Sequence, residues 1–519
     1  MRMSITTAKR HGRRGLRLGA GVTSSWLVWV AGCGAPVDAR PDPARLSTQG
    51  SLEVQVANKN TATLHEATDD PGQIETTSTG AFATGITGGF FAQLGSNGRT
   101  CNTCHIESSG WTFTPAAAQG LAATDPLFAP NDGSDCPPTS PTQGPNSAVS
   151  SEVTGYGLIR IQIGVPVGAD FALLSATNPQ ACAIGPATAG VNGQLFLFRR
   201  PPPSTNLVFD SALMWDGRET LEKPDTTAGG QSEGPVLFDL DHQANSATLG
   251  HAQGSSIAGT QTQADIVAFE TGLFTAQSLM QFQHVSLTGD GANGGAQFLS
   301  DTVAPAFFIG KNDPLQPGFS NATFDLFGAW EPTSPTYRSV KKSEQAIGRG
   351  EAVFNGTTFT IHDVPGLNSV PGDPLYNPAD PLAGTDVVGG CGVCHNNPDV
   401  GNHSTALALN IGVTLAGPVN NDGSPNTVLD TAHLPVYTLS NGSSTVAVTD
   451  PGRALITGKF ADAGKTKGPV LRGLASRAPY FHNGSAKDLT TIVTFYNARF
   501  NIGLTSAQQS DLVAFLQAL

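Results

Sequence analysis

The stretch Cys101-Asn102-Thr103-Cys104-His105 decides how this chain is organised, and its pattern returns as Cys391-Gly392-Val393-Cys394-His395. Two cysteines three positions apart can add to both vinyl groups of one haem, and the histidine that follows then lies beside the iron as its proximal ligand. A four-sulfur zinc site would require the two cysteine pairs to meet and gives no reason for a histidine after each pair. The repeated motif therefore predicts two covalently bound haem c groups, with His105 and His395 as proximal ligands.

Helical patterns flank the second motif. Ahead of it, apolar or small residues recur at helical spacing at Ala346, Ile347, Gly350 and Phe354. Two capping boxes, which begin helices by satisfying free backbone N–H groups, follow it. They are Ser485 with Asp488 and Thr505 with Gln508. The apolar positions that follow these caps at helical spacing are Leu489, Ile492, Val493, Tyr496, Leu512, Val513, Phe515 and Leu516.

Length and composition bound the architecture. The chain has 519 residues, with 61 Gly, 36 Pro and only 13% charged residues, which indicates two or three loop-rich domains. We expect a mainly α fold with extensive loops, in which two cytochrome c-like domains each carry one covalent haem c. The expected domains are 79–340, with a long insertion around 115–194, and 341–519.

The amino-terminal region is typical of an export signal. Several basic residues precede an apolar run from Leu18 to Ala31, which is too short for a membrane span. Val30-Ala31-Gly32-Cys33 looks like a bacterial lipoprotein processing box, so we expect a signal peptide over 1–32 and a lipid on Cys33 that holds the protein on a membrane. The alternative is an ordinary cleaved signal or a simple anchor. The expected location is the periplasmic side of a bacterial membrane, the outer membrane or the cell surface being further options.

The next segment and the remaining cysteines complete the outline. Residues 33–78 are expected to form a flexible tether, because 36–78 is rich in Thr, Asp, Pro and Gln and lacks sustained periodicity. Cys136 and Cys182 are the only cysteines left unassigned. Two leftover cysteines in an oxidising compartment usually pair, so we predict a disulfide between them.

Net charge limits the partners. The formal charge of −13 becomes more negative when the basic signal is removed, which makes nucleic acid an unlikely partner. Opposite charge instead favours a basic electron-transfer protein, such as a small cytochrome c or a cupredoxin.

Four further motifs carry a resemblance to a known family. They are Asn97-Gly98-Arg99, Trp215-Asp216-Gly217-Arg218, Pro469-Val470-Leu471-Arg472-Gly473 and Ala478-Pro479-Tyr480-Phe481-His482-Asn483-Gly484. In this order around two haem sites, from about Phe90 to the carboxyl terminus, the chain resembles the bacterial di-haem cytochrome c peroxidase superfamily, which includes MauG and the di-haem rubber oxygenases. The resemblance implies two unlike haems. One takes in electrons, and the other has an open iron face where hydrogen peroxide or dioxygen reacts.

The first haem is expected to have that open face. Some peroxidases of the family close it with a histidine shortly after the haem motif, but residues 106–128 contain neither histidine nor methionine. The alternative is a ligand from far along the chain, such as His251 or His242.

The second haem cannot take the methionine that the peroxidases use, because no methionine follows Cys391. The candidates are His403, His433, His482 and Tyr496. Tyr496 stands where the resemblance places the ligand after the PYFH histidine, and MauG-like members use tyrosine there. A tyrosinate would lower the iron's potential and stabilise its oxidised states. Ligation by His482, or simple packing of Tyr496 in the helix, are the alternatives.

The resemblance also assigns an electron route and a pair of polar side chains. Trp215 matches the family tryptophan that lies between the haems, although tryptophan is commonly buried without a redox role. The family's glutamine and glutamate, which manage peroxide protons, correspond to Gln243 and Gln253. Glutamine forms hydrogen bonds but does not carry a proton, so efficient peroxidase turnover would need a substitute such as His251. Another register would place Gln231, Glu233 and Pro235 near the haem, and the sequence does not choose between the two.

The family's calcium site departs from the pattern in this chain. The position that supplies a calcium ligand is Arg200, and a cation does not bind calcium, so the site is expected to be altered or absent. The leading function is peroxide reduction with an external electron donor. A MauG-like or oxygenase-like oxidation of another substrate comes second, and a plain electron-transfer cytochrome third.

Overall fold

The computed structural model describes residues 63–69, 71–78, 88–129, 131, 151–180, 182, 184–185, 191–220, 234–281 and 284–519. The predicted signal peptide, the predicted lipid site Cys33 and Cys136, the predicted disulfide partner of Cys182, lie outside these residues, as do Gln231 and Glu233. Cys182 is disulfide-bonded. No helix of the described part is long and apolar enough to span a membrane.

Nine α-helices occur in the described residues. Their bounds are α1 (Pro115–Gln119), α2 (Ser151–Tyr156), α3 (Gly234–Leu249), α4 (Thr260–Thr271), α5 (Gly295–Phe298), α6 (Lys342–Gly356), α7 (Ala454–Thr457), α8 (Leu489–Arg499) and α9 (Ser506–Gln517). Each haem motif begins in a short 3-10 turn, Cys101–Thr103 and Cys391–Val393.

The same residues contain thirteen strands in five sheets. The strands are β1 (Thr63–Thr68), β2 (Gly72–Ser78), β3 (Ile159–Pro166), β4 (Ala172–Thr177), β5 (Val191–Arg199), β6 (Leu273–Met280), β7 (Val285–Ser286), β8 (Phe359–Ile361), β9 (Val387–Gly389), β10 (Ala408–Leu409), β11 (Val436–Ser440), β12 (Thr445–Val448) and β13 (Thr466–Lys467).

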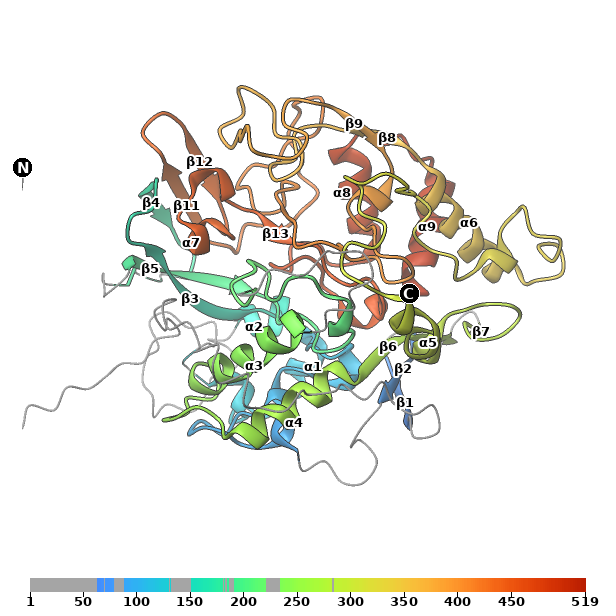
Figure 1. The fold of residues 1–519 in the computed structure, drawn as a ribbon, viewed down its shortest axis with the longest axis horizontal. Coiled ribbons are helices and arrows are strands. Elements are labelled where there is room, and N and C mark those ends of the chain that lie inside the picture. Colours follow the sequence, from blue (N-terminus) through green and yellow to red (C-terminus); the bar gives the residue numbers. More distant parts are fainter. Residues whose placement is uncertain are drawn as a thin grey trace, which may run out of the picture. The chain divides into compact units, whose positions relative to one another are not determined.

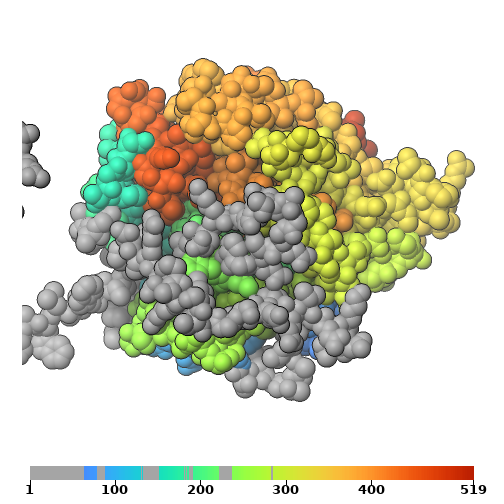
Figure 2. Space-filling view, viewed as in Figure 1, coloured from blue at the N-terminus to red at the C-terminus, as the bar shows by residue number. Residues whose placement is uncertain are grey.

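The prediction of a mainly α fold is therefore wrong. β3 and β5 form an antiparallel ribbon that pairs Ile161 with Leu197, and β11 pairs with β4, 263 residues away at Ser175 and Thr438. Alternating apolar residues build such strands, with a period of two rather than the helical spacing on which the expectation rested. Between α6 and α7 the described chain has only short strands and a 3-10 turn. This segment, amber to orange in Figure 2, forms a large part of the surface seen there.

The predicted tether is also wrong over its last residues. β1 and β2 pair with each other, and β2 pairs in turn with β6, so residues 63–68 and 72–78 belong to a four-stranded sheet in the order β1-β2-β6-β7. Thr76 and Thr77 are fully buried in this sheet. The polar composition of the segment predicted a tether, but its strands pair through backbone hydrogen bonds, and β2 buries threonine side chains.

The helices predicted around the second haem motif are present. α6, α8 and α9 lie together in Figure 1 and share one apolar core with Ile347, Phe354 and Phe515. Thr505 caps α9 in a capping box with Gln508, as predicted. α8 begins one turn later than expected, since the capping side chain is Asp488, which accepts from the Thr491 N–H, rather than Ser485.

Candidate functional site

The first haem motif lines a buried cavity of about 130 Å³, here called the first cavity. Cys101, Cys104 and His105 all face it. His105 Nδ1 lies 2.9 Å from the carbonyl oxygen of Trp111, so this nitrogen carries the proton and donates it to that oxygen. The bond fixes the orientation of the imidazole and leaves the lone pair of Nε2 free to bind a metal, as in protein histidines that ligate metals.

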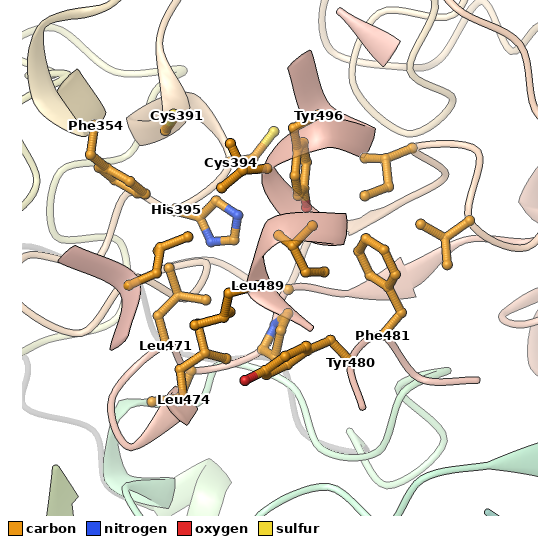
Figure 3. A pocket seen from close by; sticks show the side chains of 18 of the residues that line it. Phe354, Cys391, Cys394, His395, Leu471, Leu474, Tyr480, Phe481, Leu489 and Tyr496 are labelled. Atoms are coloured by element: carbon orange, nitrogen blue, oxygen red, sulfur yellow. The ribbon is translucent and has the colours of Figure 1, made fainter. Parts of the chain in front are cut away.

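The second haem motif lines a larger cavity of about 220 Å³, here called the second cavity. His395 Nδ1 is held in the same way, 2.6 Å from the carbonyl oxygen of Gly401. Helices α6, α8 and α9 supply apolar side chains to the wall. Figure 3 shows His395 and Tyr496 with Phe354, Leu471 and Leu489 around them.

Both cavities fit a haem c. The four cysteines of the motifs are free, and burial raises the pKa of Cys391 and of Cys394 to about 12, so their thiols stay protonated. Burial lowers the pKa of His105 to about 4, so this imidazole is neutral and able to ligate. In the second cavity, Arg477 Nη2 is buried without a hydrogen-bond partner and would meet a carboxylate such as a haem propionate.

Trp215 lines both cavities. Its indole Nε1 donates to the carbonyl oxygen of Arg200 at 2.7 Å, and its own carbonyl oxygen accepts from the N–H of Lys467 at 2.8 Å. The side chain is about nine-tenths buried. Trp215 therefore forms part of the wall that the two cavities share.

A buried ion cluster supports that wall. Asp216, which follows Trp215, pairs with Arg199 and Arg218, and Arg199 also binds Asp450. Burial alone would raise the pKa of Asp216, but the charges of Arg218 and Arg199 outweigh it and hold the pKa below its ordinary value. Both aspartates therefore stay ionised, and the cluster joins residues from distant parts of the chain.

Of the predicted acid–base side chains, Gln243 and His251 line the first cavity, whereas Gln253 does not. The Gln253 amide donates to the carbonyl oxygen of Gly250, so the ten-residue spacing of glutamines does not bring both to the cavity. Burial, and then the charges of Arg99 and Arg218, lower the pKa of His251 to about 3. Its imidazole is therefore neutral.

The Asn-Gly-Arg motif holds the backbone of His251. The side-chain amide of Asn97 donates to the His251 carbonyl oxygen at 2.7 Å, and Arg99 donates to the carbonyls of Pro126 and Leu127. The motif before the first haem site thus holds the loop that contains His251, which is far away in the sequence, beside the first cavity. The alternative ligand His242 is not among the residues that line the cavity. It is paired with Glu219 at 2.5 Å.

Two residues of the first cavity were missed in the sequence. Met214 lines it beside Trp215, and Glu270 lines it from α4. Burial raises the pKa of Glu270 to about 8, and its Oε2 lacks a hydrogen-bond partner in the structure. The sequence signal for Glu270 is its position on α4, four and three residues after the apolar Ile266 and Val267, which puts an acid on the buried face of the helix. Met214 gave no comparable signal.

Three of the four candidate ligands for the second haem line the second cavity: His403, His482 and Tyr496. Burial, followed by the nearby cysteine thiols, raises the pKa of Tyr496. His403 Nδ1 and His482 Nε2 are buried without hydrogen-bond partners, although the latter lies 3.6 Å from an Asp450 oxygen. The fourth candidate, His433, stacks on Tyr156 with ring centroids 3.5 Å apart and does not line this cavity.

Arg200 occupies the place where the resemblance would put a calcium ligand. Its guanidinium is buried and donates to the backbone carbonyl oxygens of Phe113, Tyr156 and Arg477. Carbonyl oxygens that could face a metal ion here are bound to a side-chain cation instead. Among the described residues no cluster of His, Cys, Asp and Glu suited to a metal ion is present. The donor set at this position does not fit calcium.

Comparison with known proteins identifies relatives of part of the chain. No protein-family model matches it. The chain is 35% identical over 142 residues to cytochrome-c peroxidase IdrP2 of Denitromonas iodatirespirans, and 32% identical over 145 residues to IdrP1 of the same organism. The match to IdrP2 of Pseudomonas sp. (strain SCT) is 34% over 140 residues. Each match covers 25% of this chain and 36% of the relative, so the chain spans about a third of the length of these proteins.

A solved structure of a MauG-like protein associated with microbial copper homeostasis aligns with 83% of this chain and 85% of its own, with a TM-score of 0.34 and 14% identity. The sequence relatives support the resemblance to cytochrome-c peroxidases over about a quarter of this chain.

Proposed function

We propose that this protein is a di-haem c-type cytochrome that reduces hydrogen peroxide with electrons from a small redox protein. The observation that carries the proposal is the place of Trp215, which lines both haem cavities. An indole between two redox groups shortens the distance that electrons must tunnel. Two cavities with the same attachment chemistry, joined by one aromatic side chain, suit an enzyme that takes in electrons at one site and uses them at the other.

Bound haem supplies an iron centre that exchanges electrons and reacts with peroxide. In the first cavity the chain adds proton handling. Neutral His251 can accept a proton at an imidazole nitrogen and return it, while the Gln243 amide can orient the substrate through hydrogen bonds. In the second cavity, apolar walls exclude water, and Tyr496 or a histidine is available to complete the iron's coordination.

Oxidation of another substrate is the second candidate, and Tyr496 favours it. Its phenol lines the second cavity, where no methionine is available after Cys391. An anionic oxygen ligand stabilises oxidised iron, which suits oxidative chemistry at that haem better than electron uptake. Attachment to a membrane through Cys33, a periplasm-facing location and a basic donor such as a cytochrome c or cupredoxin complete the proposal.

Steady-state peroxide consumption by the purified holoprotein with reduced cytochrome c tests the leading function. The expected result is donor oxidation that saturates with peroxide and slows in Trp215→Phe. Trp330→Phe is the matched control, because Trp330 is fully buried against Phe327 and lines neither cavity. Peroxide-independent donor oxidation, or none at all, would reject the peroxidase and leave the second candidate.

A further inference from the structure

One buried guanidinium joins the elements around the shared wall of the two cavities. Arg200 Nη2 donates to the carbonyl oxygens of Phe113 at 2.8 Å and Arg477 at 3.0 Å, and Nη1 donates to that of Tyr156 at 3.1 Å. Only backbone carbonyls accept these bonds within the described chain. Nη1 also lies 3.5 Å from the carbonyl oxygen of Gly157. The acceptors come from the segment after the first haem motif, the end of α2 with the glycine that follows it, and the segment before the PYFH motif.

The backbone of Arg200 positions residues of the site directly. Its carbonyl oxygen accepts from Trp215 Nε1 at 2.7 Å, and its N–H donates to the carbonyl oxygen of His482 at 2.6 Å. Arg200 lines both cavities, as Trp215 does. One residue therefore holds the indole with its main chain and anchors that main chain with its side chain.

The surroundings are shaped for this side chain. Gly157 has φ +65°, and a Cβ there would lie 2.2 Å from Arg200 Nη1, so a side chain at that position would displace the guanidinium. Burial lowers the pKa of Arg200 to about 10, so the group is still a cation at neutral pH. A planar cation with several N–H groups can satisfy three convergent carbonyls, whereas an ammonium lacks that fork geometry.

We infer that Arg200 is a positioning residue whose guanidinium acts as a built-in cation, binding a cage of backbone carbonyls and thereby fixing Trp215 between the two cavities. The electron-transfer part of this inference rests on the proposed function. The structural part does not, because the cage and the indole hydrogen bond can be measured without peroxide. Removal of the guanidinium leaves buried carbonyls without donors and releases the main chain that holds the indole.

The test is Arg200→Ala in the holoprotein, with and without millimolar guanidinium chloride. Electron transfer between the haems of the half-reduced protein should slow by roughly tenfold or more, since a small misplacement of a reacting group can cost about 100-fold. The resonance Raman signal of the hydrogen-bonded indole N–H should weaken. Guanidinium should restore both readouts, whereas urea and sodium chloride at equal concentration should not.

Controls separate positioning from general destabilisation. Arg349→Ala removes a guanidinium that binds Asp511 and lines neither cavity, so it should leave both readouts unchanged. If Arg200→Ala does not fold, Arg200→Lys is used; it should weaken the indole signal without responding to guanidinium, because the lysine fills the cage. Wild-type readouts in the Arg200 variant, or equal effects of urea and guanidinium, would overturn the inference. A wild-type protein without electron transfer between haems would instead overturn the proposed function, and the indole signal would still decide the role of Arg200.

Discussion

The two cavities begin from the same pentapeptide pattern and share Trp215 and Arg200, but most of their other lining side chains differ. In both, the haem motif begins in a 3-10 turn, and the histidine Nδ1 donates to the carbonyl oxygen of the residue six positions later. The first cavity then adds neutral His251, Gln243 and the uncharged Glu270, whereas the walls that α8 and α9 supply to the second are mostly apolar. The attachment motif sets which cofactor fits, and the residues brought in from elsewhere set what each site can do.

The largest effect should come from removing one attachment motif. In Cys101→Ser/Cys104→Ser the first cavity has no thiol for a covalent bond, so peroxide turnover should fall to background and mass spectrometry should show the loss of one haem. The paired variant Cys391→Ser/Cys394→Ser should also lose one haem and turnover, but its remaining haem should still react once with peroxide. Equal single-turnover behaviour in the two variants would mean that the cavities are not different in function.

A smaller loss is expected from changing the polar wall of the first cavity. His251→Ala removes the neutral imidazole, and turnover should fall by about 100-fold, the lower end of what acid–base catalysis contributes. His251→Gln should be similarly slow, because an amide forms hydrogen bonds but carries no proton. The measurement is stopped-flow reduction of peroxide across pH.

The control for that variant is His242→Ala. His242 is paired with Glu219 and does not line the cavity, so its loss should leave turnover near the wild-type value. If His251→Ala keeps full activity but changes the visible spectrum of one haem, His251 is an iron ligand rather than a proton carrier.

How much of the fold and of the two cavities can be predicted from the sequence depends on how far apart the interacting residues lie along the chain. The haem motifs and helices α6 and α9 were predicted, because their signals lie within a few residues of each other. The sequence offered His251 near the first haem only as an alternative, because its approach to His105 depends on a bond from Asn97 and on the packing of α3 and α4. A single sequence holds no record of such contacts.

The strands that the sequence analysis did not predict are of two kinds, one with a local sequence signal and one without. β3 alternates at Ile159, Ile161 and Ile163, a two-residue period that indicates a strand, whereas the expectation of a mainly α fold rests on helical spacing elsewhere in the chain. The pairing of β4 with β11 has no local signal, because Ser175 and its partner Thr438 are separated by 263 residues. The two-residue period thus indicates that the fold contains strands, but it does not predict the sheet order.

The second cavity can be probed at Tyr496. Tyr496→Phe should raise the midpoint potential of one haem and change its visible spectrum, because an anionic oxygen ligand would be lost, while turnover should change by less than roughly tenfold. Spectroelectrochemical titration measures both. Tyr437→Phe is the control, since its hydroxyl donates to the Phe196 carbonyl outside both cavities. A silent Tyr496→Phe spectrum would show that the phenol only packs against its neighbours.

The smallest effect, on stability alone, should come from Glu270. Burial raises the pKa of Glu270 to about 8, from an ordinary value of 4.5. The folded protein therefore keeps a proton that the unfolded chain releases, so the stability linked to this group is full below pH 4.5 and is lost as pH rises through 8. Glu270→Gln, whose amide stays neutral, should remove that loss and be more stable than wild type at pH 9 by about 1–3 kcal/mol, the cost of an unpaired buried group.

Urea unfolding at pH 6 and pH 9 measures this difference, and Glu351→Gln provides the contrast. Burial also raises the pKa of Glu351 to about 8, but its two oxygens accept from the backbone N–H groups of Leu326 and Phe327. Its replacement should therefore destabilise the protein at both pH values, because an amide supplies only one acceptor atom for two donors. Parallel pH profiles for wild type and Glu270→Gln would mean that Glu270 is ionised in the holoprotein. The first cavity would then be charged where the structure makes it neutral, and the contrast with the second cavity would be one of charge as well as polarity.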